Sequence, residues 1–153
     1  MQEKEYYTIE DFIQVVKELR GENGCPWDKK QTHESLIPCL VEESGEVVEA
    51  IEHHDMQNLE EELGDVLLQV VMHARIAEER GDFNFSDVVD GVCRKMIRRH
   101  PHVFGNETFS TREEQLSSWR KIKELEKIEK KRKARELAEN KEISAFWLDM
   151  LSP

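Results

Sequence analysis

The sequence from Glu42 to Asp65 reads EESGEVVEAIEHHDMQNLEEELGD, and the fold can be worked out from it. It holds two acidic clusters with the same spacing: Glu42, Glu43 and Glu46, then Glu61, Glu62 and Asp65. Positions three or four apart share one face of a helix, so Glu43 and Glu46 can converge on one point. The same spacing lets Glu62 and Asp65 converge from a second helix. The pattern predicts two consecutive helices, each with a carboxylate pair.

A turn of a few residues, from about Asp55 to Asn58, would fold these helices into an αα-hairpin, with Asn58 capping the second. The hairpin would bring four carboxylates together: Glu43, Glu46, Glu62 and Asp65. Close carboxylates repel one another unless a cation lies among them. Oxygen ligands favour Mg²⁺, with Mn²⁺ as a possible substitute. The alternative for a lone Glu-x-x-Glu is a solvated helix face.

The second helix of this hairpin favours the metal interpretation. Between Leu59 and Ala77 its apolar residues cover nearly the whole circumference, which is typical of a buried helix. Glu62 and Asp65 stand in its first turns. Carboxylates in a buried helix need a partner, and a metal ion provides one.

Composition narrows the class of protein. The chain has 153 residues, 36% charged and 38% hydrophobic, which fits a water-soluble protein with a substantial core. The net charge of −11 argues against binding to a nucleic-acid polymer. No apolar run approaches a membrane span, the N-terminal residues lack a signal-peptide pattern, and the three cysteines lack metal-binding spacing. We therefore expect a cytoplasmic protein that binds no membrane.

Helical spacing and capping signals recur along the chain, and we expect an all-α bundle of about five helices. Thr8 caps the first helix, which stops at Arg20-Gly21, and the second runs from about Thr32 to His54. Arg80-Gly81 ends the third helix, while Ser86 and Thr111 cap the fourth and fifth. Residues 22–30 are expected to form a loop in which Trp27 packs on the edge of the core.

The fourth helix ends in a basic turn that contains Lys95, Arg98 and Arg99. Cations at a helix C-terminus can simply compensate the helix dipole. Opposite an acidic metal site, the same residues suit phosphate oxygens.

The end of the chain changes character. Residues 121–142 are mostly charged and predict a solvated helix, whereas the following AFWLDMLSP is apolar again. Phe146, Trp147 and Leu148 can dock on the body of the protein or on a second subunit. We therefore expect residues 1–123 to form the functional domain and residues 124–153 a helical extension with an apolar tail.

Five segments together closely resemble the MazG family of nucleotide pyrophosphohydrolases: Gly24-Cys-Pro-Trp-Asp28, Gln31-Thr32-His33, Glu42-Glu43-x-x-Glu46, Glu62-Leu-Gly-Asp65 and Lys95-Met-Ile-Arg-Arg-His-Pro-His-Val-Phe-Gly105. The resemblance covers about residues 19–123. It implies an all-α fold completed by dimerisation, as a homodimer or a dimer of dimers. It also implies Mg²⁺-dependent hydrolysis of ribo- or deoxynucleoside triphosphates to monophosphate and pyrophosphate, as house-cleaning of the nucleotide pool.

The resemblance also implies roles for individual residues. Glu43, Glu46, Glu62 and Asp65 become metal ligands, and Glu42 and Glu61 become outer carboxylates or the base that orients water. Lys95 and Arg99 become phosphate ligands, while Trp119 and Lys123 close over the nucleotide. Arg98, which stands next to Arg99 in the basic turn, is also expected to bind substrate. Larger family members carry two such domains in tandem, and this chain carries one.

Two other hypotheses stay open. The chain could be a non-catalytic helical interaction module whose acidic cluster and charged tail dock a partner, in which case stoichiometric Mg²⁺ binding is not required. Within the enzyme class, it could prefer dUTP, dCTP or damaged nucleotides, since base preference depends on the shape of the pocket.

Overall fold

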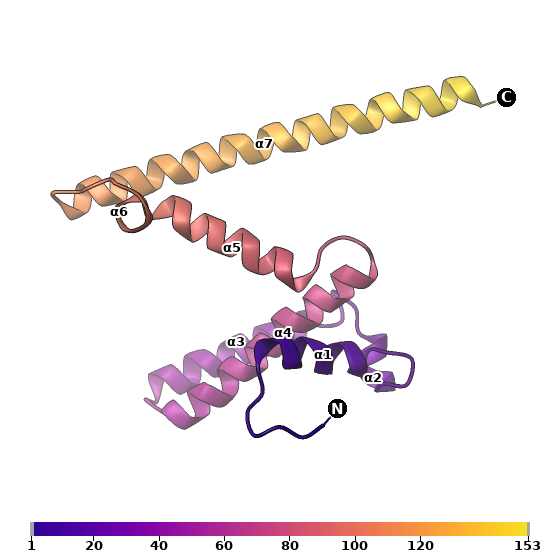
Figure 1. Cartoon of the computed structure of the whole chain (residues 1–153), viewed down its shortest axis with the longest axis vertical. Coiled ribbons are helices and arrows are strands. Elements are labelled where there is room, and N and C mark those ends of the chain that lie inside the picture. Colours follow the sequence, from indigo (N-terminus) through magenta and orange to yellow (C-terminus); the bar gives the residue numbers. More distant parts are fainter. Residues whose placement is uncertain (1, 153) are drawn as a thin grey trace. The chain divides into compact units, whose positions relative to one another are not determined.

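The computed structural model describes residues 2–152, and in that range the chain is all helical (Figure 1). It contains seven helices and no strand there: α1 (Ile9–Leu19), α2 (Pro26–Lys30), α3 (Ile37–Glu52), α4 (Met56–Glu79), α5 (Phe85–Arg99), α6 (Pro101–Phe104) and α7 (Arg112–Leu151). The all-α class is confirmed. The five expected helices are α1, α3, α4, α5 and α7, and the two short helices α2 and α6 come in addition.

The chain divides into two compact units, with the division between Asp90 and Gly91 inside α5. The first unit contains α1 to α4 and the start of α5. The second contains the rest of α5, α6 and α7. The expected functional boundary after residue 123 remains a prediction, and α7 continues through it as one helix.

The first unit is built on the hairpin of α3 and α4, on which α1 packs. A tight turn joins the two long helices, and His54 adopts a positive φ of 54° there. The buried core is small and apolar, and consists of Val16, Leu36, Val71, Met72 and Ile76. Val16 comes from α1 and the last three from α4, so this core fixes α1 against the C-terminal half of α4.

Several helix ends follow the predicted signals. Thr8 and Asp11 form the predicted capping box, in which the Asp11 N–H donates to Thr8 Oγ1 over 3.3 Å and the Thr8 N–H donates to Asp11 Oδ2 over 2.9 Å. Thr111 accepts from the Glu114 N–H at the start of α7, as expected. Arg80 is the C-cap of α4, and Gly81 follows it with a positive φ of 77°.

Two predicted caps are wrong by a few residues. Asp55, not Asn58, caps α4, because its carboxylate accepts the Asn58 N–H over 3.1 Å. At α5, the Asn84 side chain accepts the Asp87 N–H over 3.0 Å, which places the cap ahead of Ser86. In each case two capping residues lie within one turn, and the earlier one begins the helix.

The prediction that α4 is buried all round is wrong for one of its faces. Leu63 is 51% exposed, and Leu67 and Val70 also face solvent, while the opposite face of α4 forms the core. On α3, Val48 and Ile51 are likewise about half exposed. Trp27, expected on the core edge, is 77% exposed at the start of α2. An apolar pattern indicates which residues are suited to pack against another element, but it does not indicate whether that element belongs to the same chain.

In the second unit, α7 is an unbroken helix of 40 residues. The short helix α6 follows His100 and begins with Pro101, which suits the first turn because proline has no N–H to leave unpaired. No helix in the described part of the chain is both long and apolar enough to cross a membrane.

Candidate functional site

The hairpin of α3 and α4 brings four carboxylates together. Glu43 and Glu46 come from α3, and Glu62 and Asp65 from α4. One oxygen atom of each side chain lies within 4.8 Å of the corresponding oxygen of the others. The three-residue spacing places both members of each pair on the helix face that meets the other helix. The sequence pattern therefore locates the cluster correctly in space.

Two members of this cluster are poorly compensated. Oε2 of Glu43 and Oε2 of Glu62 are buried, and neither finds a hydrogen-bond partner among residues 2–152. Glu62 itself is 9% exposed. An unpaired buried carboxylate oxygen is costly, so these atoms call for either a proton or a cation.

The protonation of the cluster reflects the same crowding. A hydrogen bond to the Glu46 side chain, burial, and the negative charges of Glu46, Asp65 and Glu43 raise the pKa of Glu62 to about 7. Burial, followed by the charges of Glu46 and Asp65, raises the pKa of Glu43. The cluster thus holds a proton near neutrality when no cation is present.

The donor set fits a hard divalent cation. All four groups offer carboxylate oxygens, which Mg²⁺ and Mn²⁺ prefer, and no soft sulfur ligand is among them. A cation among the four side chains would partner the orphaned oxygens of Glu43 and Glu62. It would also remove the repulsion that keeps a proton on the cluster.

Glu42 and Glu61 are not part of the group of four. Both are exposed, and each lies one residue ahead of a cluster member. A helix turns about 100° per residue, so each side chain points away from its neighbour in the cluster. Their expected role at the attacking water stays a prediction.

The second unit contains all five basic and aromatic residues that are expected to bind substrate. Arg99 lies over the ring of Trp119, with its guanidinium carbon 5.8 Å from the ring centroid, and Lys123 Nζ lies 4.3 Å from the same centroid. Such cation–π contacts fix the ring and the two cations relative to one another. Arg98 and Lys95 are exposed on the last turns of α5.

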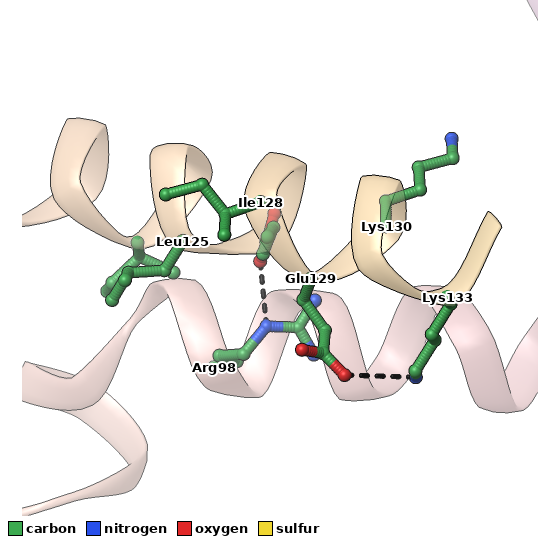
Figure 2. Close-up of a pocket in the computed structure, with 8 residues that line it drawn as sticks. Arg98, Leu125, Ile128, Glu129, Lys130 and Lys133 are labelled. Atoms are coloured by element: carbon green, nitrogen blue, oxygen red, sulfur yellow. Dashed lines mark hydrogen bonds and ion pairs between the residues drawn. The ribbon is translucent and has the colours of Figure 1, made fainter. Parts of the chain in front are cut away.

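Glu126 is a member of this group that the sequence interpretation missed. Its carboxylate accepts from Arg98 Nε over 2.7 Å (dashed in Figure 2) and from Arg99 Nη2 over 2.8 Å. The two arginines lower the pKa of Glu126, chiefly through the hydrogen bond from Arg99. Glu126 lies 27 residues after Arg99 in a strongly charged helix, so no local pattern distinguishes it from its neighbours.

A histidine pair was missed for the same reason. Nδ1 of His33 lies 2.7 Å from Nδ1 of His73, and their rings stack 5.0 Å apart and nearly parallel. Burial and the nearby His33 lower the pKa of His73. One of the two nitrogens must carry the hydrogen and the other accept it, so the pair fixes one tautomer of each ring.

Comparison with known proteins gives consistent matches. The family model of the MazG nucleotide pyrophosphohydrolase domain matches residues 31–104, a range that includes all four clustered carboxylates and the basic turn of α5. The chain is 49% identical over 123 residues to the nucleoside triphosphate pyrophosphohydrolase/pyrophosphatase MazG of Thermotoga maritima, covering 80% of this chain and 47% of that protein. It is also 49% identical over 122 residues to the protein YabN of Bacillus subtilis, covering 80% of this chain and 25% of YabN.

A solved structure shows the same fold. The crystal structure of a mazG-related protein from Thermotoga maritima superposes with a TM-score of 0.64 at 30% sequence identity. The match covers 76% of this chain and 99% of that one. In contrast, the chain spans between a quarter and about half of the length of the two curated relatives.

Proposed function

Starting from the fact that the chain belongs to the MazG nucleotide pyrophosphohydrolase family, we propose that it hydrolyses nucleoside triphosphates to nucleoside monophosphate and pyrophosphate. The observation that carries this proposal is the convergence of four carboxylates from α3 and α4 within 4.8 Å. The name of the Thermotoga maritima relative, nucleoside triphosphate pyrophosphohydrolase/pyrophosphatase MazG, agrees with it.

Glu43, Glu46, Glu62 and Asp65 would hold the divalent cation, Mg²⁺ with Mn²⁺ as a substitute. When bound, such an ion polarises phosphate oxygens and neutralises the charge that develops on them. The orphaned oxygens of Glu43 and Glu62 support this assignment, because both are buried and find no hydrogen-bond partner in the described part of the chain.

Other side chains would activate the attacking water and stabilise the leaving group. An exposed carboxylate, Glu42 or Glu61, would orient the attacking water and accept its proton. The water attacks the α-phosphorus, the bond from that phosphorus to the bridging oxygen breaks, and the electron pair leaves with pyrophosphate. Positive side chains placed at the leaving group stabilise its charge.

The basic residues of the second unit suit the triphosphate. Lys95, Arg98 and Arg99 would bind phosphate oxygens, Arg99 through N–H donors other than those that Glu126 accepts. Trp119 and Lys123 would cover the nucleoside. The contacts of Arg99 and Lys123 with the Trp119 ring support a shared site, since they hold these three residues together before any ligand arrives.

We also propose that the first unit dimerises, as a homodimer or a dimer of dimers. The support is the exposed apolar faces of the hairpin, which include Val48 and Ile51 on α3 and Leu63 and Leu67 on α4. Apolar faces of this kind are normally covered by another element. A second hairpin offers a matching surface under two-fold symmetry.

The test is product analysis with a panel of ribo- and deoxynucleoside triphosphates, with Mg²⁺ and with excess EDTA. We expect equimolar monophosphate and pyrophosphate with Mg²⁺ and none with EDTA, and the rank order of the panel identifies the preferred base. Release of orthophosphate and nucleoside diphosphate instead would show attack at the γ-phosphorus and would overturn the assignment of the α-phosphorus. Absence of any turnover on the whole panel would overturn the proposed reaction.

A further inference from the structure

One face of α7 carries two separate apolar patches. The first patch consists of Ile122, Leu125 and Ile128; the second consists of Ile143, Phe146, Trp147 and Met150. At about 100° per residue, all seven side chains fall within an arc of roughly 120°. Apart from Ile122, these side chains are more than half exposed, from 55% for Ile128 to 65% for Leu125. Both patches therefore face the same direction and lack cover.

The two patches cannot cover each other within one chain. They lie on a single unbroken helix (Figure 1), and residues 128 and 143 are separated by roughly 22 Å along its axis at a rise of about 1.5 Å per residue. An isolated helix gains little stability from its own sequence, and burial of an apolar face is what normally maintains it. A second copy of the chain, however, carries a complementary patch for each of them.

The first patch forms one wall of a groove. The groove has a volume of about 650 Å³ and is lined by Ile122, Leu125 and Ile128 of α7 and by Arg98 of α5 (Figure 2). A space of this size accommodates one or two large aromatic side chains. The second patch supplies two such side chains, Phe146 and Trp147.

The charges between the patches select the orientation of a partner helix. Residues 127–135 contain six lysines or arginines and one glutamate, whereas residues 136–149 contain four acidic residues and one lysine. Two such helices aligned in parallel would place like charges side by side. Aligned antiparallel, each basic segment faces the acidic segment of the other helix.

We propose that α7 pairs antiparallel with α7 of a second copy of this chain, so that the first patch of each copy receives the second patch of the other. Opposing residue 128 to residue 143 places residue 125 against residue 146. The two-fold axis then passes between Arg135 and Glu136. The same register opposes Arg132 to Glu139, so the polar centre of the face pairs opposite charges. The surface is self-complementary, as a two-fold interface requires.

Disulfide cross-linking tests both the contact and its direction. The background is the full chain with Cys25, Cys39 and Cys93 replaced by serine, and oxidation is catalysed by copper phenanthroline. In Glu136→Cys the new thiol lies beside the two-fold axis, so we expect a covalent dimer in high yield. Ala138→Cys is the matched control, because its side chain points to the opposite side of α7, and we expect at most background cross-linking.

A third variant distinguishes the two directions of pairing. Leu125→Cys should not cross-link with itself in an antiparallel pair, but a mixture with Phe146→Cys should give the mixed dimer. Circular dichroism of each variant confirms that the helices are retained. Cross-linking of Leu125→Cys alone would show a parallel pair and overturn the proposal. Equal yields for Glu136→Cys and Ala138→Cys, or no product from Glu136→Cys, would overturn it as well.

Discussion

Gly24, within the Gly24-Cys-Pro-Trp-Asp28 segment, stands where no side chain fits. The turn after α1 is closed by the Cys25 N–H, which donates to the Leu19 carbonyl over 2.8 Å, and by the Gly24 N–H, which donates to Gly21 over 3.0 Å. A Cβ atom on Gly24 would lie 2.2 Å from the Leu19 oxygen and 2.3 Å from the Glu18 oxygen. Both atoms belong to the backbone, so neither can rotate away.

The cost of Gly24→Ala follows from this geometry. Relieving the overlap requires a backbone shift of about 1 Å, with about 1–3 kcal/mol of strain. The shift also breaks the two hydrogen bonds of the turn, each of which contributes about 1 kcal/mol. We therefore expect the free energy of unfolding to fall by about 3–5 kcal/mol, the sum of these two contributions. At roughly 2–4 °C per kcal/mol for a chain of this size, Tm should fall by about 10 °C.

Gly45→Ala is the matched control. Gly45 lies within α3, and a Cβ there meets no atom of the described residues within 4 Å. Alanine favours the helix over glycine by up to about 1 kcal/mol, so this substitution should leave Tm unchanged or raise it slightly. Both variants are measured by thermal unfolding followed by circular dichroism. Equal Tm values for Gly24→Ala and the parent protein would show that the turn after α1 accommodates a Cβ atom at this position.

Three further predictions concern the titrating groups and the proposed site. In metal-free protein, stability should fall as the pH rises from about 4.5 to about 7. The reason is that the folded chain keeps a proton on Glu62, whose pKa is raised to about 7, whereas the unfolded chain releases that proton. Saturating Mg²⁺ or the substitution Glu62→Gln should remove this pH dependence of Tm in thermal melts. Below pH 6.5, the ordinary pKa of histidine, stability should fall as the pH drops, because the pKa of His73 is lowered in the folded chain and the unfolded chain therefore binds the proton more readily. His73→Gln should abolish this decline in stability. If the decline persists in that variant, another group causes it. Lys95→Ala should raise KM for the preferred triphosphate about tenfold with a smaller change in kcat, since it removes one charge-assisted phosphate contact, and a loss of helicity in that variant would instead show a structural role.

Local chemistry explains what the sequence predicted well. The caps at Thr8 and Thr111 and the stop at Gly81 depend on hydrogen bonds or backbone angles within one turn, so a short window of sequence contains them. The carboxylate cluster combines two such local facts. Each pair converges because its two members are three residues apart on one helix. The connection between the two helices is short, which favours a hairpin.

Long-range contacts explain what the sequence did not predict. His33 and His73 are 40 residues apart, and nothing in either neighbourhood indicates that their rings stack. Glu126 is one of many charged residues of α7, and its contacts with Arg98 and Arg99 depend on how α7 passes α5 within the second unit. The exposure of Leu63 and Leu67 on α4 also depends on long-range packing, because an apolar sequence pattern does not indicate which other element packs against a helix face.

Titration of Mn²⁺, with the free ion followed by electron paramagnetic resonance, tests the cation site directly. We compare the parent protein with Glu46→Gln, which removes one clustered carboxylate, and with Glu49→Gln, which removes the same charge from an exposed position on α3. We expect stoichiometric binding to the parent and to Glu49→Gln, and at least about a hundredfold weaker binding to Glu46→Gln. Equal affinity in the two variants, or no binding to the parent, would show that the clustered carboxylates do not form a cation site.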